Sequence, residues 1–259
     1  MASRMPSLFF GHGSPLNAIS SNPFTQAWSA IGEALPRPQA ILCISAHWYT
    51  SGSDLTLSSA PETIHDFGGF PPELYAVQYP APGDARFAQR VQKLLAPLAV
   101  DLTEQWGLDH GTWSVLRHVY PRADVPVVQL SIDGTKPAAF HFDVGRRLAA
   151  LREENVLIVG SGNLVHNLRA YQFGAPNAKP LDWAVQFDAR VRELLQARDY
   201  APLQKYETLG REALLSIPTP EHYLPLMYVL GASSEDDRLQ FPVEGIDGGS
   251  VSMLTVQLG

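Results

Sequence analysis

The chain has 259 residues, of which 45% are apolar and 17% are charged, a balance typical of a folded protein and not of a disordered one. Its 19 Lys and Arg residues are outnumbered by 26 Asp and Glu residues, and the net charge of −7, without any basic cluster, argues against nucleic acid as a partner. The single cysteine, Cys43, excludes a disulfide bond within the chain. No Ser- or Gly-rich linker interrupts the sequence, so residues 1–259 are expected to form one domain.

Apolar runs and helical periods alternate along the chain. In order, the pattern predicts strands at 7–10 and 40–45, helices at 84–98 and 112–120, a strand at 125–132, a helix at 137–153, a strand at 156–159, helices at 181–198 and from near Pro220, and a closing strand at 250–256. Asp84 is expected to cap its helix, and Pro137 to occupy the first turn of another. This alternation predicts a single-domain α/β fold with a mostly parallel central sheet flanked by helices.

The N-terminus runs directly into the first short apolar segment, which ends at Gly11. That segment is too short for the core of a signal peptide or for a membrane span. We therefore expect a cytoplasmic protein that does not interact with a membrane.

Three histidines fall just beyond predicted strands. His12 follows the first strand, His47 follows the strand at 40–45, and His166 follows the strand at 156–159 after a short turn. Because ligands of open α/β sheets bind beyond the carboxyl ends of the strands, these side chains are expected to lie at one edge. Imidazole is a frequent ligand of zinc and of ferrous iron, so this placement predicts a metal site in which His12 and His47 are the first ligands.

The remaining histidines are judged by their surroundings. His118 lies late in a predicted helix and His141 lies inside another, so neither is expected to bind metal. His222 is a further candidate beside the carboxylate of Glu221, and from residue chemistry alone either could be the third ligand. If both are helical, adjacent side chains point about 100° apart, so only one should face the ion.

Six motifs, in order along the chain, resemble those of the DODA-type extradiol ring-cleavage dioxygenases. They are Gly11-His12-Gly13-Ser14-Pro15, Ser45-Ala46-His47-Trp48, His65-Asp66-Phe67-Gly68-Gly69-Phe70-Pro71, Gly107-Leu108-Asp109-His110-Gly111-Thr112-Trp113, Gly160-Ser161-Gly162-Asn163-Leu164-Val165-His166-Asn167 and Thr219-Pro220-Glu221-His222-Tyr223. Gln129-Leu130-Ser131-Ile132-Asp133 also fits this series. The resemblance covers nearly the whole chain and implies a DOPA 4,5-dioxygenase-like protein of the class III extradiol superfamily.

The resemblance implies roles for particular residues. It places the metal on His12, His47 and His222, with His166 as a nearby fourth histidine. The ion is expected to be Fe(II) for activity or Zn(II) as isolated. Histidine titrates near neutrality, so His166 and then His110 are the candidate acid–base groups. Substrate contact is expected from His65, Asp66, Phe67 and Tyr223.

The function implied is 4,5-cleavage of a catechol such as DOPA with dioxygen. Two alternatives remain at this point. A zinc hydrolase could use the same histidines to activate water. A metal-stabilised binding protein would keep the ligands without turnover, although its expected hallmark, the loss of His110 and His166, is not seen. For a DOPA carboxylate, Arg169 is an available cationic partner.

Overall fold

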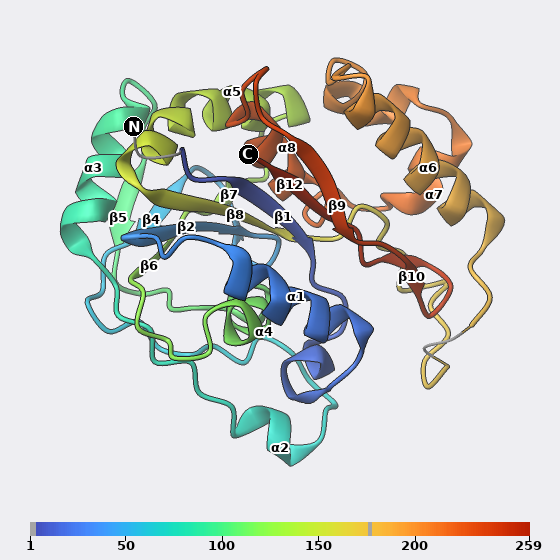
Figure 1. Ribbon diagram of the computed structural model, residues 1–259, viewed down its shortest axis with the longest axis horizontal. Coiled ribbons are helices and arrows are strands. Elements are labelled where there is room, and N and C mark those ends of the chain that lie inside the picture. Colours follow the sequence, from blue (N-terminus) through green and yellow to red (C-terminus); the bar gives the residue numbers. More distant parts are fainter. Residues whose placement is uncertain (1–3, 176–177) are drawn as a thin grey trace.

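The computed structural model describes residues 4–175 and 178–259, and it is built around one six-stranded sheet (Figure 1). The strand order is β6-β2-β8-β1-β12-β9. The strands span Ser7–Gly11 (β1), Ala40–Ser45 (β2), Val127–Gln129 (β6), Val156–Gly162 (β8), Leu239–Val243 (β9) and Thr255–Leu258 (β12). The first four strands of this order pair in parallel, and β12 and β9 add an antiparallel edge. The predicted α/β class with a mostly parallel sheet is therefore confirmed.

Helices cover both faces of the sheet, which explains why its central strands are apolar throughout. Every residue of β1, β2 and β8 is buried. Side chains such as Phe10, Ile41 and Cys43 pack on one face with α1 (Pro23–Ala34) and α4 (His110–Val119). Those such as Phe9, Leu42 and Ile44 pack on the other, with α3 (Ala85–Leu95), α5 (Ala138–Leu148) and α8 (Leu224–Gly231) (Figure 1).

The remaining elements lie outside the central sheet and its flanking helices. They are η1 (Pro15–Ile19), β3 (Tyr49–Thr50), β4 (Asp54–Thr56), α2 (Pro72–Tyr75), β5 (Asp101–Thr103), β7 (Ile132–Asp133), η2 (Ala149–Glu154), α6 (Asp182–Gln196), η3 (Leu203–Thr208), α7 (Arg211–Ser216), β10 (Ile246–Asp247) and β11 (Val251–Ser252). None of the helices in the described part of the chain has the length and apolar character needed to cross a membrane.

Several predicted boundaries need correction. Asp84 caps α3 as expected, since its carboxylate accepts a hydrogen bond of 2.9 Å from Phe87 N. Pro137, however, lies one residue before α5 in extended backbone, and the predicted helix at 137–153 ends at Leu148 and continues as the 3₁₀ turn η2. The helix expected near Pro220 begins only at Leu224, after a turn.

Two predicted strands are each divided. The run at 125–132 breaks into β6 and β7 because Ser131 bonds Asp54 outside the main sheet: its backbone N–H donates to Asp54 O at 2.9 Å, and its hydroxyl accepts from Asp54 N at 2.8 Å. The run at 250–256 is shared between β11 and β12, since Met253 N donates instead to Gly245 O. The β11 strand pairs with β10, whereas β12 joins the central sheet.

Candidate metal centre and active site

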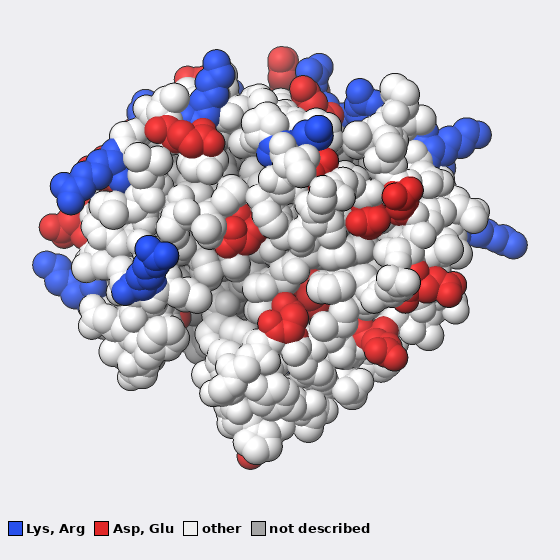
Figure 2. All heavy atoms as spheres, turned by 180° about the vertical axis from the view of Figure 1, so that it is seen from behind, with Lys and Arg blue, Asp and Glu red and all other residues white. Residues whose placement is uncertain are grey.

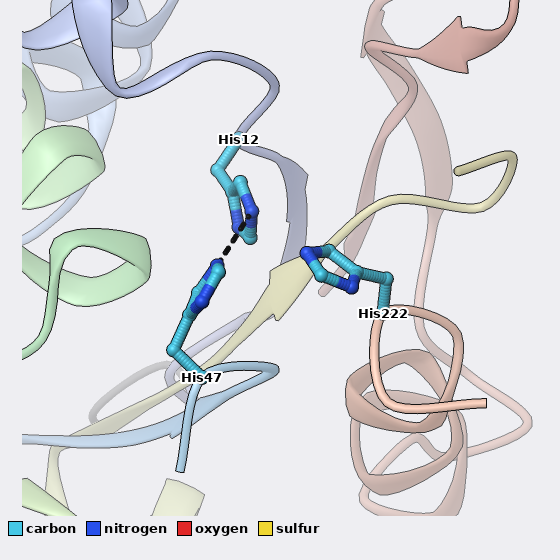
Figure 3. Close-up of side chains that lie close together, drawn as sticks. All are labelled: His12, His47 and His222. Carbon is cyan, nitrogen blue, oxygen red and sulfur yellow. Dashed lines mark hydrogen bonds between the residues drawn. The ribbon is translucent and has the colours of Figure 1, made fainter. Parts of the chain in front are cut away.

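Three histidines from separate segments converge at the carboxyl edge of the sheet (Figure 3). His12 directly follows β1, His47 lies two residues after β2, and His222 lies in the turn before α8. The parallel register brings the ends of β1 and β2 to opposite sides of the end of β8. His12 and His222 have ring centroids 5.3 Å apart, and His47 and His222 have centroids 5.1 Å apart.

The spacing of the ring nitrogens fits a single metal ion. The Nε2 atoms of His12 and His47 lie 3.3 Å apart. Zinc binds imidazole nitrogen at about 2.0–2.1 Å, so two nitrogens at a tetrahedral angle around it lie about 3.3–3.4 Å apart. One ring nitrogen from each of the three histidines falls within 4.8 Å of the others. The three side chains therefore have the spacing of a ligand set.

The second ring nitrogen of His12 is held by Ser161. The His12 Nδ1 atom lies 2.9 Å from Ser161 Oγ, and that hydroxyl donates its proton to Gly111 O. Since Ser161 has only one proton to donate, His12 Nδ1 must donate to Ser161 Oγ. The lone pair of His12 is then on Nε2, the atom that faces His47.

Carboxylates hold the Nδ1 atoms of the other two rings. His47 Nδ1 lies 3.2 Å from Asp66 Oδ2, and His222 Nδ1 lies 3.2 Å from Glu221 Oε1. A histidine that binds metal through one nitrogen commonly donates the other N–H to a carboxylate, which fixes its orientation. Glu221 thus contacts the His222 ring directly, and the two residues lie in a turn and not in the helix assumed from sequence.

Burial keeps these rings neutral. It lowers the pKa values of His12 and His222 well below the usual value, and neighbouring histidines lower them further. Burial and His110 lower the pKa of His47 to about 3, although the Asp66 carboxylate acts in the opposite direction. Neutral imidazole is the form that binds metal, so the chemistry of the donor set fits a divalent cation.

Two further histidines adjoin the cluster. The ring of His166 stacks on His222 at 3.5 Å and 9°, and burial lowers its pKa to about 4. His110 begins α4, and its Nδ1 lies 3.0 Å from Asp66 Oδ2 while its backbone N–H donates to Asp66 Oδ1 at 2.9 Å. Asp66 therefore links His110 to His47. The structure places His118 and His141 outside this cluster: His118 bonds Asn17 O, and His141 bonds the Tyr228 hydroxyl.

The histidines form the floor of a cavity of about 330 Å³. Its lining comprises His12, Gly13, Ser14, Pro15, Leu16, His47, Phe67, Phe70, His110, His166, Leu168, Tyr171, Phe173, Gly174, His222 and Val251. The four aromatic side chains that are not histidines come from two loops, one before α2 and one after β8. The space therefore combines a metal-ligating floor with apolar walls, as is usual for a small-molecule site.

The four residues expected to contact substrate are placed differently from one another. Phe67 lines the cavity, and its ring packs edge-to-face on His110 at 5.4 Å. Asp66 instead faces two histidines. His65 is not part of the lining, and its Nε2 bonds Val77 O at 3.0 Å. Tyr223 is fully buried with its hydroxyl donating to Leu203 O, so it has no access to the cavity.

Sequence reasoning missed Ser161 and several wall residues. Ser161 lies in the small-residue run that ends β8, two residues after the end of the strand predicted at 156–159, and that position was the only indication of a role. Leu168, Tyr171 and Phe173 follow His166 in a segment without any helical or strand period. Only their closeness in sequence to His166, a histidine beyond a strand, could have indicated that they line the cavity.

Comparisons with known proteins show the family to which the chain belongs. Residues 12–251 match the family model described as the catalytic LigB subunit of aromatic ring-opening dioxygenase. The chain is 52% identical to a 4,5-DOPA dioxygenase extradiol of Escherichia coli K12, over 100% of this chain and 96% of that protein. It is 37% identical to a protein of the same description from Beta vulgaris, over 94% and 92% of the two chains.

A solved structure shares the fold. The crystal structure of an uncharacterized protein from Escherichia coli K12 superposes with a TM-score of 0.87, at 48% identity and over 99% of this chain and 100% of that one. The family match begins at His12, the first ligand candidate, and includes His47, His166 and His222. The chain therefore belongs to the LigB family of aromatic ring-opening dioxygenases and is an extradiol dioxygenase.

Proposed function

We propose that this enzyme holds Fe(II) on His12, His47 and His222 and uses dioxygen to open a catechol ring, with 4,5-cleavage of DOPA as the reference reaction. The observation that supports the ligand set most strongly is the convergence of three neutral imidazoles, each held on Nδ1 by another group. When bound, Fe(II) would orient the diol and mediate the transfer of electrons between the ring and dioxygen. Zinc fits the same nitrogens and is the expected ion in protein isolated without added iron.

The acid–base work is assigned to His166 and His110. His166 lines the cavity beside His222 and is neutral at pH 7, because burial lowers its pKa to about 4. A neutral imidazole has a ring nitrogen free to accept a catechol proton. His110 also lines the cavity, and Asp66 accepts from its Nδ1, which directs the other ring nitrogen away from that carboxylate. The Phe67 ring against His110 helps to exclude water from this wall.

The test begins with metal-free protein reconstituted under anaerobic conditions with Fe(II) or with Zn(II). Dioxygen and a panel of catechols are then added, and oxygen uptake and the coloured ring-opened product are followed. Fe(II) protein is expected to consume oxygen, and Zn(II) protein is not. An iron-loaded enzyme that is inactive with every catechol would refute the proposal and would favour the alternative function, that of a zinc hydrolase.

Substitutions separate ligands from acid–base groups. His12→Ala is expected to lose most of the bound metal, whereas His166→Ala should retain at least part of it and lose turnover. Metal content is measured by elemental analysis beside the rate of oxygen uptake. His141→Gln removes a buried histidine remote from the cluster and serves as the control. Equal metal loss in His12→Ala and His166→Ala would make His166 a full ligand.

A further inference from the structure

Asp109 joins the first turn of α4 to the ends of two strands. It is fully buried and is the N-cap of α4, since its Oδ1 accepts from Thr112 N at 3.1 Å. The same oxygen accepts from the hydroxyl of Ser45 at 2.6 Å, and Oδ2 accepts from the side-chain amide of Gln129 at 2.7 Å. Gln129 Oε1 in turn accepts from Asp109 N at 3.2 Å. A buried carboxylate needs such donors, and here they connect α4 to β2 and β6.

Ser45 connects this carboxylate to a ligand candidate. Ser45 is the last residue of β2, and its Oγ accepts from the backbone N–H of His47 at 3.2 Å. The hydroxyl has one proton, which it donates to Asp109. The backbone of His47 is therefore held by a carboxylate that lies 64 residues away from Ser45 in the sequence.

The first turn of α4 also reaches His12. Gly111 lies two residues after the cap, and its carbonyl accepts from the hydroxyl of Ser161, which in turn accepts from His12 Nδ1. A β-carbon at Gly111 would lie 2.9 Å from His47 Cδ2, so the turn packs directly against that ring. A displacement of this turn would therefore move the surroundings of two ligand candidates.

We propose that Asp109 is a positioning residue of the metal centre, which fixes His47 through Ser45 and His12 through the first turn of α4. The inference rests on the ligand set of the proposed function. Because Asp109 is fully buried, it acts through these groups and not on the substrate. Loss of a group that orients metal ligands commonly lowers metal affinity by about 10–100-fold, and we expect about tenfold here because Asp109 contacts no ligand ring directly.

The principal test is Asp109→Asn. If the amide oxygen keeps the contacts with Ser45 and Thr112, its NH2 group meets the NH2 group of Gln129, so the turn must shift. Affinity for Co(II) is measured by competition with a chromophoric chelator, and the visible spectrum of the Co(II)-saturated protein reports the ligand geometry. We expect about tenfold weaker binding and an altered spectrum. Wild-type affinity, or weaker binding with the wild-type spectrum, would overturn the inference.

Ser45→Ala tests the same connection without altering the helix cap. It removes the link between Asp109 and His47 and leaves the contacts of the carboxylate with Thr112 and Gln129 in place. This variant should also bind Co(II) more weakly and with an altered spectrum, and it keeps the inference testable if Asp109→Asn does not fold. Wild-type affinity and spectrum in Ser45→Ala would show that Asp109 does not act through His47 and would overturn the inference.

A second helix cap provides the matched control. Asp84 caps α3 in the same way, with Phe87 N as its donor at 2.9 Å. Asp84→Asn should therefore leave the Co(II) affinity and spectrum unchanged, and equal effects of Asp84→Asn and Asp109→Asn would reduce the role of Asp109 to helix stability. If the wild-type protein binds neither Co(II) nor Zn(II), the proposed metal centre itself fails. If it binds them and Asp109→Asn binds them equally well, only the role of Asp109 fails.

Discussion

Each histidine at the floor of the cavity is oriented by a different kind of partner. His12 donates to a neutral hydroxyl, whereas His47 and His222 face carboxylates. A carboxylate partner increases the basicity of a ligating imidazole more than a hydroxyl does. Asp66 contacts two rings, whereas Glu221 contacts one, because the Oδ2 atom of Asp66 lies close to the Nδ1 atoms of both His47 and His110.

Asp66→Asn is expected to lower metal affinity by about 10–100-fold, because the neutral amide keeps one acceptor oxygen where the carboxylate uses Oδ2 for two imidazole N–H groups and Oδ1 for the backbone N–H of His110. The measurement is competition for Zn(II) or Co(II) with a chromophoric chelator, which is independent of turnover. Asp54→Asn provides the control, since Asp54 lies on β4 outside the histidine cluster. If Asp66→Asn binds metal as tightly as the wild type, Asp66 does not orient His47 in the metal-bound protein.

The histidine pattern was predictable because His12 and His47 follow strands whose ends meet by the geometry of parallel pairing. Their Nδ1 partners were not, since a partner remote in sequence leaves no local pattern; His12 and its partner Ser161, for instance, are 149 residues apart. Tyr223 shows that closeness in sequence to a site residue does not place a side chain in the site. It adjoins His222 in sequence, but the turn directs its ring away from the cavity onto Tyr206, with centroids 4.9 Å apart.

At the scale of elements, the continuous apolar runs of β1, β2 and β8 made these strands predictable, whereas the run at 125–132 was misleading. Hydropathy continues through Leu130, but the hydroxyl of Ser131 binds Thr50 and Asp54 and redirects the chain toward β7. Competition between a side-chain hydroxyl and the sheet ladder is not visible in the period of apolar residues. Element boundaries depended on such contacts, whereas the identity of the central strands did not.

The close approach of α5 and α8 depends on glycine. A β-carbon at Gly231 would lie 2.1 Å from Phe142 O, and one at Gly145 would lie 2.3 Å from Tyr228 O. Both obstacles are backbone atoms, so relief requires that the helices separate. These helices pack on the face of the sheet that carries Phe9, Leu42 and Ile158.

Gly231→Ala is expected to reduce the free energy of unfolding by about 1–3 kcal/mol, because overpacking outweighs the gain in helix propensity. Urea denaturation followed by circular dichroism measures the change. Gly68→Ala is the control, since a β-carbon there meets nothing within 4 Å. Metal affinity should stay unchanged in folded Gly231→Ala. An unchanged or increased stability would show that the two helices adjust without cost.

At the scale of the whole molecule, the charges on the face shown in Figure 2 are dispersed, with basic side chains mainly along the outline and acidic ones nearer the centre. One buried cation, Arg152, instead ties distant parts of the chain together. It is 1% exposed and donates to Met5 O, Ala232 O and Leu258 O. Its guanidinium also contacts both carboxylate oxygens of Asp237, at 2.6 and 2.9 Å. Both ends of the described chain are thus joined to η2.

Asp237→Asn is expected to cost about 3–5 kcal/mol at pH 7, because it leaves the buried guanidinium without its counter-charge. The effect should depend on pH. Burial raises the pKa of Asp237, but the hydrogen bonds from Arg152 and Ser234 and the charge of Arg152 outweigh it, so the folded-state pKa lies below the ordinary 3.8. The contribution of the pair is therefore complete above the unfolded-state pKa and is lost as the pH falls through the folded-state value.

The stability difference between wild type and Asp237→Asn should consequently be constant from neutral pH down to about pH 5 and shrink below about pH 4. Urea denaturation of both proteins across this range gives the difference directly, and acid effects from other groups cancel because both proteins share them. Arg37→Gln, which removes an exposed pair with Asp124, should leave the stability nearly unchanged at every pH, because water screens exposed ion pairs. A difference for Asp237→Asn that is as large at pH 3 as at pH 7 would mean that the charge of Asp237 does not stabilise the junction of the two chain ends, and that its shape and hydrogen bonds do so.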